Sequence, residues 1–162
     1  MADLRSWTQP SPYGDVTIVV SDAGVRSVSL PDSSVAAEAH VERDDAIARQ
    51  FDEWFAGRRH GFDLVLDLDG IDGFRLAVMK TLQRDVPWGE TVSYGELAQM
   101  AGRPRAARAV GRTMATNPLP FVIPCHRVLA AGGKIGGYGR GANAIDLKRA
   151  LLAREGVTIQ RR

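Results

Sequence analysis

The sequence of 162 residues contains one cysteine, Cys125, and only three histidines. One thiol cannot form an internal disulfide, and it excludes a zinc site built from several cysteines. Two of the histidines, His40 and His60, lie in the first half of the chain without the close spacing of metal ligands. We therefore expect neither a bound metal nor a cofactor, and any thiol chemistry must use Cys125.

Long apolar runs are also absent. The longest, residues 16–20 and 119–123, are far shorter than the roughly 20 residues that a membrane-spanning helix needs. The N-terminal residues 1–5 lack the apolar region of a signal peptide. Because 44% of the residues are hydrophobic, the chain can still bury a core. These features predict a soluble cytoplasmic protein that does not bind membranes.

Charge is divided unevenly along the chain. Residues 1–100 carry 9 Lys and Arg against 17 Asp and Glu, a net charge of −8, whereas residues 101–162 carry 12 against 2, a net charge of +10. A basic C-terminal region of this kind favours binding to a polyanion. The alternative is that the two regions neutralise each other within the molecule.

The first part of the sequence predicts a small α/β lobe. Residues 16–20 and 25–30 alternate between apolar and polar, with turn residues between them, which is typical of a β-hairpin. Residues 44–55 have helical spacing, and residues 62–68 return to the alternation of a strand. From residue 72 the pattern becomes helical. We therefore predict an N-terminal α/β lobe, residues 1–71, and a mainly helical domain, residues 72–162.

Three helices are expected at the start of the second domain. Phe74, Val78 and Leu82 recur at helical spacing in the first. Ser93 and Glu96 form a capping box at the start of the second. Pro104 fits the first turn of the third, which should continue to residue 115. Two short helices joined by a tight turn are typical of a helix-turn-helix.

The third of these helices is predicted to bind DNA. Arg105, Arg108 and Arg112 are spaced so that they share one helical face, where they can contact phosphates. Small residues such as Ala106 and Ala109 allow the backbone to approach a groove closely. The alternative is an ordinary amphipathic helix whose arginines face solvent.

Cys125 lies in a setting that favours reactivity. An isolated cysteine is usually an inert, buried apolar residue. Here it follows Pro124 and precedes His126 and Arg127, two residues that can favour a thiolate electrostatically. A thiolate is a strong nucleophile, so this segment is the candidate active site.

The segment Ile-Pro-Cys-His-Arg-Val at residues 123–128 resembles the signature of the O6-alkylguanine-DNA alkyltransferases, also called methylated-DNA–protein-cysteine methyltransferases. Five further groups of residues match this family in the same order, and the resemblance covers about the last half of the chain. These groups are residues 89–98, 107–111, 117–118, 137–138 and 151–156.

The resemblance implies a fold and an activity. The fold is a ribonuclease H-like α/β lobe followed by a winged helix-turn-helix domain. The activity is DNA repair by direct, irreversible and stoichiometric transfer of an alkyl group from O6-alkylguanine to Cys125. The substrate is double-stranded DNA, bound through the minor groove with the damaged base flipped out, and no cofactor takes part. The protein would act as a monomer, with cooperative binding along DNA left open.

The resemblance also assigns catalytic roles. Cys125 would accept the alkyl group, His126 would deprotonate it through a water molecule, and Glu155 would polarise the histidine. Asn117 would brace the turn before the active-site loop. Tyr94 would press on the target phosphate and supply a proton toward the departing guanine.

The remaining assignments concern DNA and the pocket. Arg108 would fill the gap that the flipped base leaves in the stack, while the other residues of its helix, Arg105, Arg112, Ala106 and Ala109, would contact DNA. The flipped guanine would be held by four residues, which are Val128, Tyr138, Gly139 and Arg140.

Two other classes of function compete with alkyl transfer. One is a non-catalytic protein that recognises damaged DNA, or a helix-turn-helix regulator, and the other is a cysteine hydrolase that uses Cys125 and His126. Alkyltransferase-like binding proteins replace the acceptor cysteine, whereas this chain keeps it together with His126, Asn117 and Glu155. The sequence therefore favours alkyl transfer.

Arg140 departs from the family pattern, because it occupies a glycine position in a loop that is roughly three residues longer than usual. If its side chain narrows the pocket, the protein should transfer benzyl groups from O6-benzylguanine more slowly than methyl groups, and Arg140→Gly should speed benzyl transfer. Single-turnover rates on the two substrates measure this. Equal rates, or no gain in the variant, would instead favour an Arg140 that turns outward to a phosphate.

Overall fold

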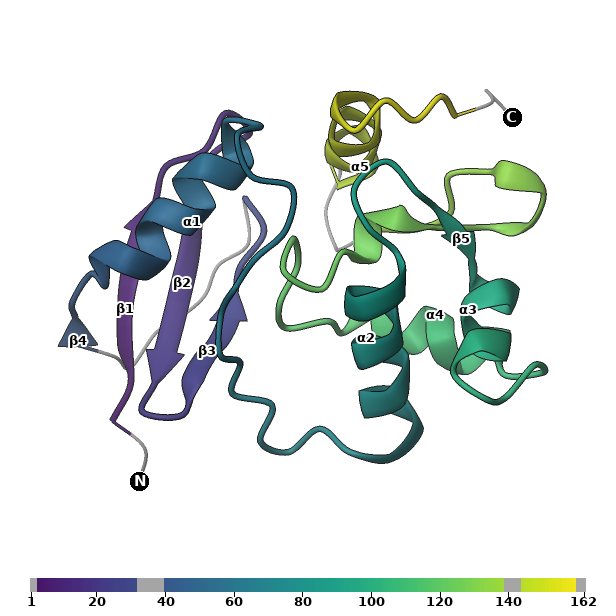
Figure 1. Cartoon of the computed structure of the whole chain (residues 1–162), viewed down its shortest axis with the longest axis horizontal. Coiled ribbons are helices and arrows are strands. Elements are labelled where there is room, and N and C mark those ends of the chain that lie inside the picture. Colours follow the sequence, from purple (N-terminus) through teal and green to yellow (C-terminus); the bar gives the residue numbers. More distant parts are fainter. Residues whose placement is uncertain (1–2, 32–39, 139–143, 160–162) are drawn as a thin grey trace. The chain divides into compact units, whose positions relative to one another are not determined.

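The structure is a computed structural model that describes residues 3–31, 40–138 and 144–159 (Figure 1). The chain divides into two units, Met1–Asp69 and Gly70–Arg162. The first is a β-sheet with one helix, and the second is mainly helical with a short two-stranded sheet. None of the helices in the described part of the chain is both long and apolar enough to cross a membrane.

The sheet of the first unit has the strand order β3-β2-β1-β4. Its strands are β1 (Arg5–Gln9), β2 (Val16–Ser21), β3 (Gly24–Val28) and β4 (His40–Val41). The antiparallel pairing of β2 with β3 confirms the predicted hairpin, although a register shift at Val19/Val20 interrupts it. Strand β1 pairs antiparallel with β2 and parallel with β4.

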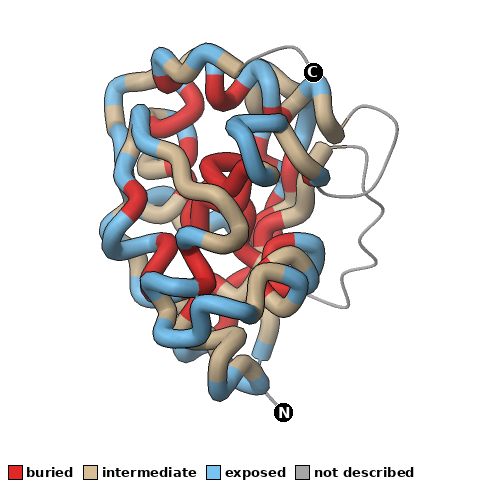
Figure 2. The backbone as a smooth tube through the Cα atoms, turned by 90° about the vertical axis from the view of Figure 1, so that its right-hand side faces the viewer, coloured by how far each residue is buried: buried red, intermediate tan, exposed pale blue. Residues whose placement is uncertain are grey.

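Helix α1 (Asp45–Phe55) covers one face of this sheet (Figure 1) and confirms the helix predicted over residues 44–55. The side chain of Asp44 caps its first turn by accepting from the amide of Ile47 at 3.1 Å. Phe51 and Trp54 are fully buried, because they recur on the face that meets the sheet. Figure 2 shows such buried stretches in red, enclosed by more exposed backbone.

Residues 62–68 do not form the strand predicted from their alternation. They pair with β3 only through a bridge between Val25 and Leu66. The backbone of Asp63 instead hydrogen-bonds the side chain of Gln50 on α1, through its amide at 2.8 Å and its carbonyl at 2.9 Å. Because α1 takes these backbone groups, the segment is free to pair with the sheet over only a few residues.

The second unit contains four α-helices and two short strands among its described residues. These are α2 (Gly73–Asp85), β5 (Val92–Ser93), α3 (Tyr94–Met100), α4 (Ala107–Ala115), β6 (Val128–Leu129) and α5 (Ala144–Arg154). Two 3-10 turns, η1 (Cys125–Arg127) and η2 (Ala131–Gly133), lie between α4 and α5. The predicted capping box of Ser93 and Glu96 is present at the start of α3. Strand β5 pairs parallel with β6.

The prediction that Pro104 occupies the first turn of α4 is wrong. The helix begins at Ala107, and Pro104 lies in the turn before it, where the amide of Ala106 donates to the carbonyl of Arg103 at 3.0 Å. Proline is favoured at the second position of such a turn, because its fixed φ suits both the turn and the first turn of a helix. Arg105 therefore precedes α4 and does not share a helical face with Arg108.

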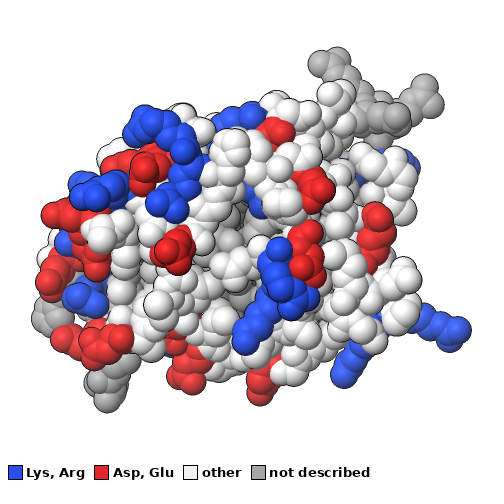
Figure 3. Space-filling view, in the orientation of Figure 1, with Lys and Arg blue, Asp and Glu red and all other residues white. Residues whose placement is uncertain are grey.

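Acidic and basic side chains are interspersed on the face of the molecule shown in Figure 3. Exposed ion pairs such as Arg84–Asp85 at 2.8 Å and Arg43–Asp45 at 3.3 Å place opposite charges side by side. Pairs this exposed add little stability. The fold depends instead on its apolar core and on a few buried polar networks.

Gly24 opens β3 with φ of +140°, and a Cβ atom there would lie 2.4 Å from the carbonyl oxygen of Val65. We predict that Gly24→Ala lowers the free energy of unfolding by roughly 2–4 kcal/mol, through backbone strain and this collision. Gly57→Ala is the control, because Gly57 has φ of +77° but no atom near its Cβ position; it should cost about 1 kcal/mol. Urea unfolding of the whole chain measures both, and equal costs would contradict the collision.

Candidate active site

Cys125 begins the 3-10 turn η1 in the middle of a continuously buried segment, residues 119–129. Its amide donates to the carbonyl of Ile123 at 2.7 Å, and the amide of Arg127 donates to the carbonyl of Pro124 at 2.9 Å. These bonds close two successive tight turns around Cys125, which is only 6% exposed. These turns therefore fix the backbone that carries the thiol.

Asn117 braces the chain that leads into this turn. Its side-chain amide donates to the carbonyl of Ile123 at 2.8 Å, and its side-chain oxygen accepts from the amide of Leu119 at 2.9 Å. Between these residues Phe121 adopts a left-handed conformation, with φ of 74°, while its ring is buried. Such a conformation costs roughly 1–2 kcal/mol, which the two bonds of Asn117 and the buried ring offset.

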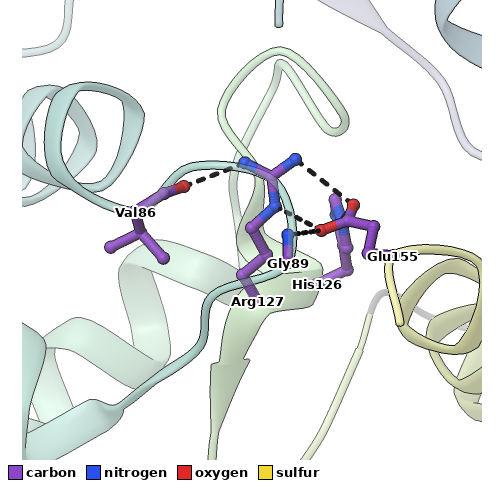
Figure 4. A network of polar contacts seen from close by, with 5 residues as sticks. All are labelled: Val86, Gly89, His126, Arg127 and Glu155. Carbon is purple, nitrogen blue, oxygen red and sulfur yellow. Dashed lines mark hydrogen bonds and ion pairs between the residues drawn. The ribbon is translucent and has the colours of Figure 1, made fainter. Parts of the chain in front are cut away.

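A buried carboxylate connects the segments around the site (Figure 4). Glu155 Oε2 lies 2.6 Å from His126 Nε2, and the Arg127 guanidinium donates to both oxygens of Glu155 at 2.8 and 3.2 Å. The amide of Gly89 donates to Glu155 Oε1 at 3.2 Å, and Arg127 also donates to the carbonyl of Val86 at 2.9 Å. The side chains of His126 and Glu155 are fully buried.

This network shifts the protonation of both of its titratable groups. Burial raises the pKa of Glu155, but hydrogen bonds and charges from His126 and Arg127 outweigh it and hold that pKa at about 2. Burial lowers the pKa of His126, against the opposing effect of Glu155. At neutral pH the site therefore holds an ionised carboxylate beside a neutral imidazole, which can accept a proton.

A pocket of about 120 Å³ opens beside the thiol. Its lining comes from α3, α4, η1 and the loop after η2, and consists of Tyr94, Gly111, Met114, Ala115, Cys125, Gly137 and Tyr138. Burial raises the pKa of both phenols in this lining. Tyr94 and Tyr138 therefore stay protonated near neutral pH and can donate a hydrogen bond into the pocket.

Burial also raises the pKa of Cys125, so the resting residue is a thiol. Hydrogen bonds from Asn117 and Tyr138 and the charge of Lys148 oppose this effect and favour the thiolate. The arrangement keeps the nucleophile protonated until a base accepts its proton. It then offers donors and a positive charge to the sulfur.

The interpretation that Arg127 favours the thiolate is wrong. Its guanidinium points to Glu155 and to the carbonyl of Val86, because the turn at Cys125 directs neighbouring side chains to different partners. The cation that acts on the thiol is Lys148 of α5. Sequence reasoning missed it, although a lysine three and four residues before the buried Leu151 and Leu152 is an anomaly on an apolar helical face.

The predicted DNA-binding residues lie on and just before α4. Arg108 and Arg112 are exposed on the helix, and Arg105 is exposed in the turn that precedes it. Val110 and Met114 are buried on the opposite face of α4. Ala106 and Ala109 are half-buried.

The predicted guanine pocket is only partly described. The backbone of Val128 lies in β6, where its carbonyl accepts from Lys148 Nζ at 2.7 Å, and Tyr138 is in the pocket wall. Gly139 and Arg140 lie outside the described residues. Among the residues that the structure describes, no group of three or more His, Cys, Asp or Glu side chains is suited to hold a metal ion.

Comparison with known proteins connects this geometry to a family. The family model for the DNA-binding domain of 6-O-methylguanine DNA methyltransferase matches residues 73–157. The chain is 40% identical over 153 residues to a methylated-DNA–protein-cysteine methyltransferase of Mycolicibacterium paratuberculosis, covering 91% of this chain and 90% of that protein. It is 44% identical over 151 residues to the protein of the same name from Methanosarcina barkeri, covering 90% and 92%.

A solved structure shows that the similarity to this family extends to the fold. The structure of Mycobacterium tuberculosis OGT in complex with DNA superposes with a TM-score of 0.82 at 37% identity, covering 94% of this chain and 92% of that one. The likeness therefore extends over both units.

Removal of the buried carboxylate should destabilise the protein in a pH-dependent way. We predict that Glu155→Gln lowers the free energy of unfolding by about 3 kcal/mol at neutral pH, because Arg127 stays buried without its counter-ion. The pKa of Glu155 is depressed to about 2 in the folded state, so its stabilisation is present above the ordinary value of 4.5 and is lost as pH falls toward 2.

The difference in unfolding free energy between wild type and Glu155→Gln should therefore shrink over that acid range in urea titrations. Asp85→Asn, which removes the carboxylate of an exposed pair, is the control and should change stability little. A difference that stays constant down to pH 2 would contradict the depressed pKa of Glu155.

Proposed function

The chain belongs to the 6-O-methylguanine DNA methyltransferase family and repairs DNA by transferring an alkyl group to cysteine, and we propose that Cys125 is the acceptor. The observation that carries this proposal is a buried Cys125 at a pocket, adjacent to a His126 that is itself held by an ionised Glu155. Cys125 is also the only cysteine in the chain. Those relatives are named for transfer from methylated DNA, so we take O6-alkylguanine as the substrate.

We propose that the chain forms two domains, residues 1–71 and residues 72–162, and that the second domain binds DNA. The sheet and helix of the first fit a ribonuclease H-like lobe. In the second, α3 and α4 with the β5–β6 pair fit a winged helix-turn-helix, with α4 as the element that enters the minor groove. Half-buried alanines at positions 106 and 109 support this, because small side chains let the backbone approach DNA.

Binding to DNA would extrude the damaged base. The O6 carbon is unreachable inside a duplex, and flipping the nucleotide costs a few kcal/mol. Arg108, exposed on α4, would occupy the vacated space in the stack. Arg105 and Arg112 are also exposed, and their guanidinium groups would bind phosphates on either side.

The chemistry combines one displacement at the alkyl carbon with proton transfers from Cys125 to His126 and from Tyr94 to the guanine. The proton of Cys125 passes to His126 through a water molecule, and Glu155 stabilises the imidazolium that forms. The thiolate attacks the alkyl carbon, a carbon–sulfur bond forms, and the carbon–oxygen bond breaks with its electron pair going to O6. Tyr94 donates a proton to the guanine as it leaves, and the proton held by His126 then replaces the one that Tyr94 gave up, so the thioether, the guanine and both side chains end neutral.

The product is a thioether, which water does not cleave readily, so each molecule would act once. Asn117 holds the turn in place during attack, and Tyr138 and the backbone of Val128 hold the base in the pocket. We place Gly139 and Arg140 in the same pocket by family pattern. The protein would work as a monomer in the cytoplasm, where reducing conditions keep the thiol free.

A mass spectrum separates this activity from its alternatives. After incubation with duplex DNA containing O6-methylguanine, the protein should gain one methyl group in place of a hydrogen, and peptide mapping should locate it on Cys125. Cys125→Ser is the control and should bind the DNA without gaining mass. Binding without an adduct in the wild type would indicate a recognition protein, and repeated turnover of an ester without an adduct would indicate a hydrolase.

A further inference from the structure

Lys148, the cation that acts on the thiol, is buried in the second unit with no carboxylate among its hydrogen-bond partners in the described part of the chain. Its residue has 0% exposure, and its ammonium donates to three backbone carbonyls, those of Val128 at 2.7 Å, Gly137 at 3.0 Å and Ile135. These three acceptors use all three donors of the ammonium group. They are neutral groups, so none of them cancels the charge. A fold rarely buries a lysine in this way without a counter-ion.

The carbonyls that Lys148 binds belong to the walls of the active site. Val128 follows the turn of Cys125 directly, and Gly137 lines the pocket beside Tyr138. One side chain on α5 therefore ties the segment after the nucleophile to the loop that forms the pocket wall. The position of that wall relative to the thiol depends on this tie.

The charge of Lys148 also acts on the sulfur. It favours the thiolate of Cys125, and the thiolate in turn raises the pKa of Lys148, which burial otherwise lowers to about 8. Two other titratable groups face the thiol, Tyr94 of α3 and Tyr138. Both keep their protons near neutral pH, so they donate hydrogen bonds but carry no charge.

Lys148 and Glu155 lie seven residues apart, and the amide of Glu155 still donates to the carbonyl of Leu151 at 3.2 Å, so the helical geometry of α5 continues to it. Residues at this spacing share a helical face. One face of α5 thus directs a positive charge toward Cys125 and a negative charge toward His126.

We propose that Lys148 is a further positioning residue for alkyl transfer, which fixes the pocket wall and favours the thiolate, so that α5 supplies opposite charges to the two ends of the Cys125-to-His126 proton transfer. The inference rests on the proposed function of Cys125. It adds a specific residue to the part of the mechanism that generates the nucleophile.

The test is a titration of the thiolate in the DNA-free protein, followed by its ultraviolet absorbance. Because Cys125 is the only cysteine, the signal is specific, and Cys125→Ser supplies the blank. Lys148→Met should reduce the thiolate fraction at neutral pH about tenfold, the scale expected for loss of a neighbouring opposite charge. Lys148→Arg should keep most of it. Arg149→Met, an equal charge change at an exposed position of α5, should leave it unchanged.

Two outcomes would overturn the proposal. One is a folded Lys148→Met with the titration of the wild type, and the other is a Lys148→Arg that shifts as far as Lys148→Met, since a purely structural tie would not distinguish the charge. Circular dichroism verifies the fold of each variant.

A reciprocal measurement covers the case in which Lys148→Met does not fold. The Lys148 ammonium, followed by nuclear magnetic resonance, should titrate at lower pH in Cys125→Ser than in the wild type, because linkage between two sites is mutual. An unchanged titration would overturn the proposal. Neither titration needs DNA, so a missing methyl adduct on Cys125 would refute the alkyl transfer alone.

Discussion

The ionised carboxylate of Glu155, buried between His126 and Arg127, is the interaction on which the active site depends. A charge in the interior is costly unless it is paired and hydrogen-bonded, and here a guanidinium, an imidazole and the amide of Gly89 surround it. The same carboxylate joins the end of α5, the turn of the cysteine and the segment after α2. Stability of the second unit and the basicity of the histidine therefore have a common origin.

Cys125, the nucleophile, differs from Glu155 because it is buried in its neutral form. A thiol and a neutral imidazole can be buried at low cost, whereas the ion pair that they form on proton transfer cannot. The surroundings of Cys125 lower that cost with fixed groups: Asn117, Tyr138 and the charge of Lys148. Groups that are already in position need no reorganisation when charge develops, which is the general basis of electrostatic catalysis.

Local signals allowed much of this structure to be predicted from sequence. The hairpin of β2 and β3, helix α1 and the capping box of Ser93 are set by residues close together in the chain, and all are confirmed. The misplaced start of α4 at Pro104 has a local cause, the turn that precedes the helix, but two other failures have distant causes. Residues 62–68 lost their strand to the side chain of Gln50, and Arg127 turned toward a carboxylate that lies 28 residues further along the chain.

Residues 65–67 cover the outer edge of strand β3 in the first unit, where other protein chains could otherwise pair. The amide of Val25 donates to Val65 and the carbonyl of Val25 accepts from Asp67, both at 2.9 Å, while the Asp67 carboxylate binds Ser21 and Arg26. These contacts occupy backbone groups on the outer edge of β3, and the opposite edge strand, β4, is only two residues long. Unpaired strand edges recruit other chains into mixed sheets and aggregates. A segment too short to be a strand thus protects the sheet from joining a neighbour's.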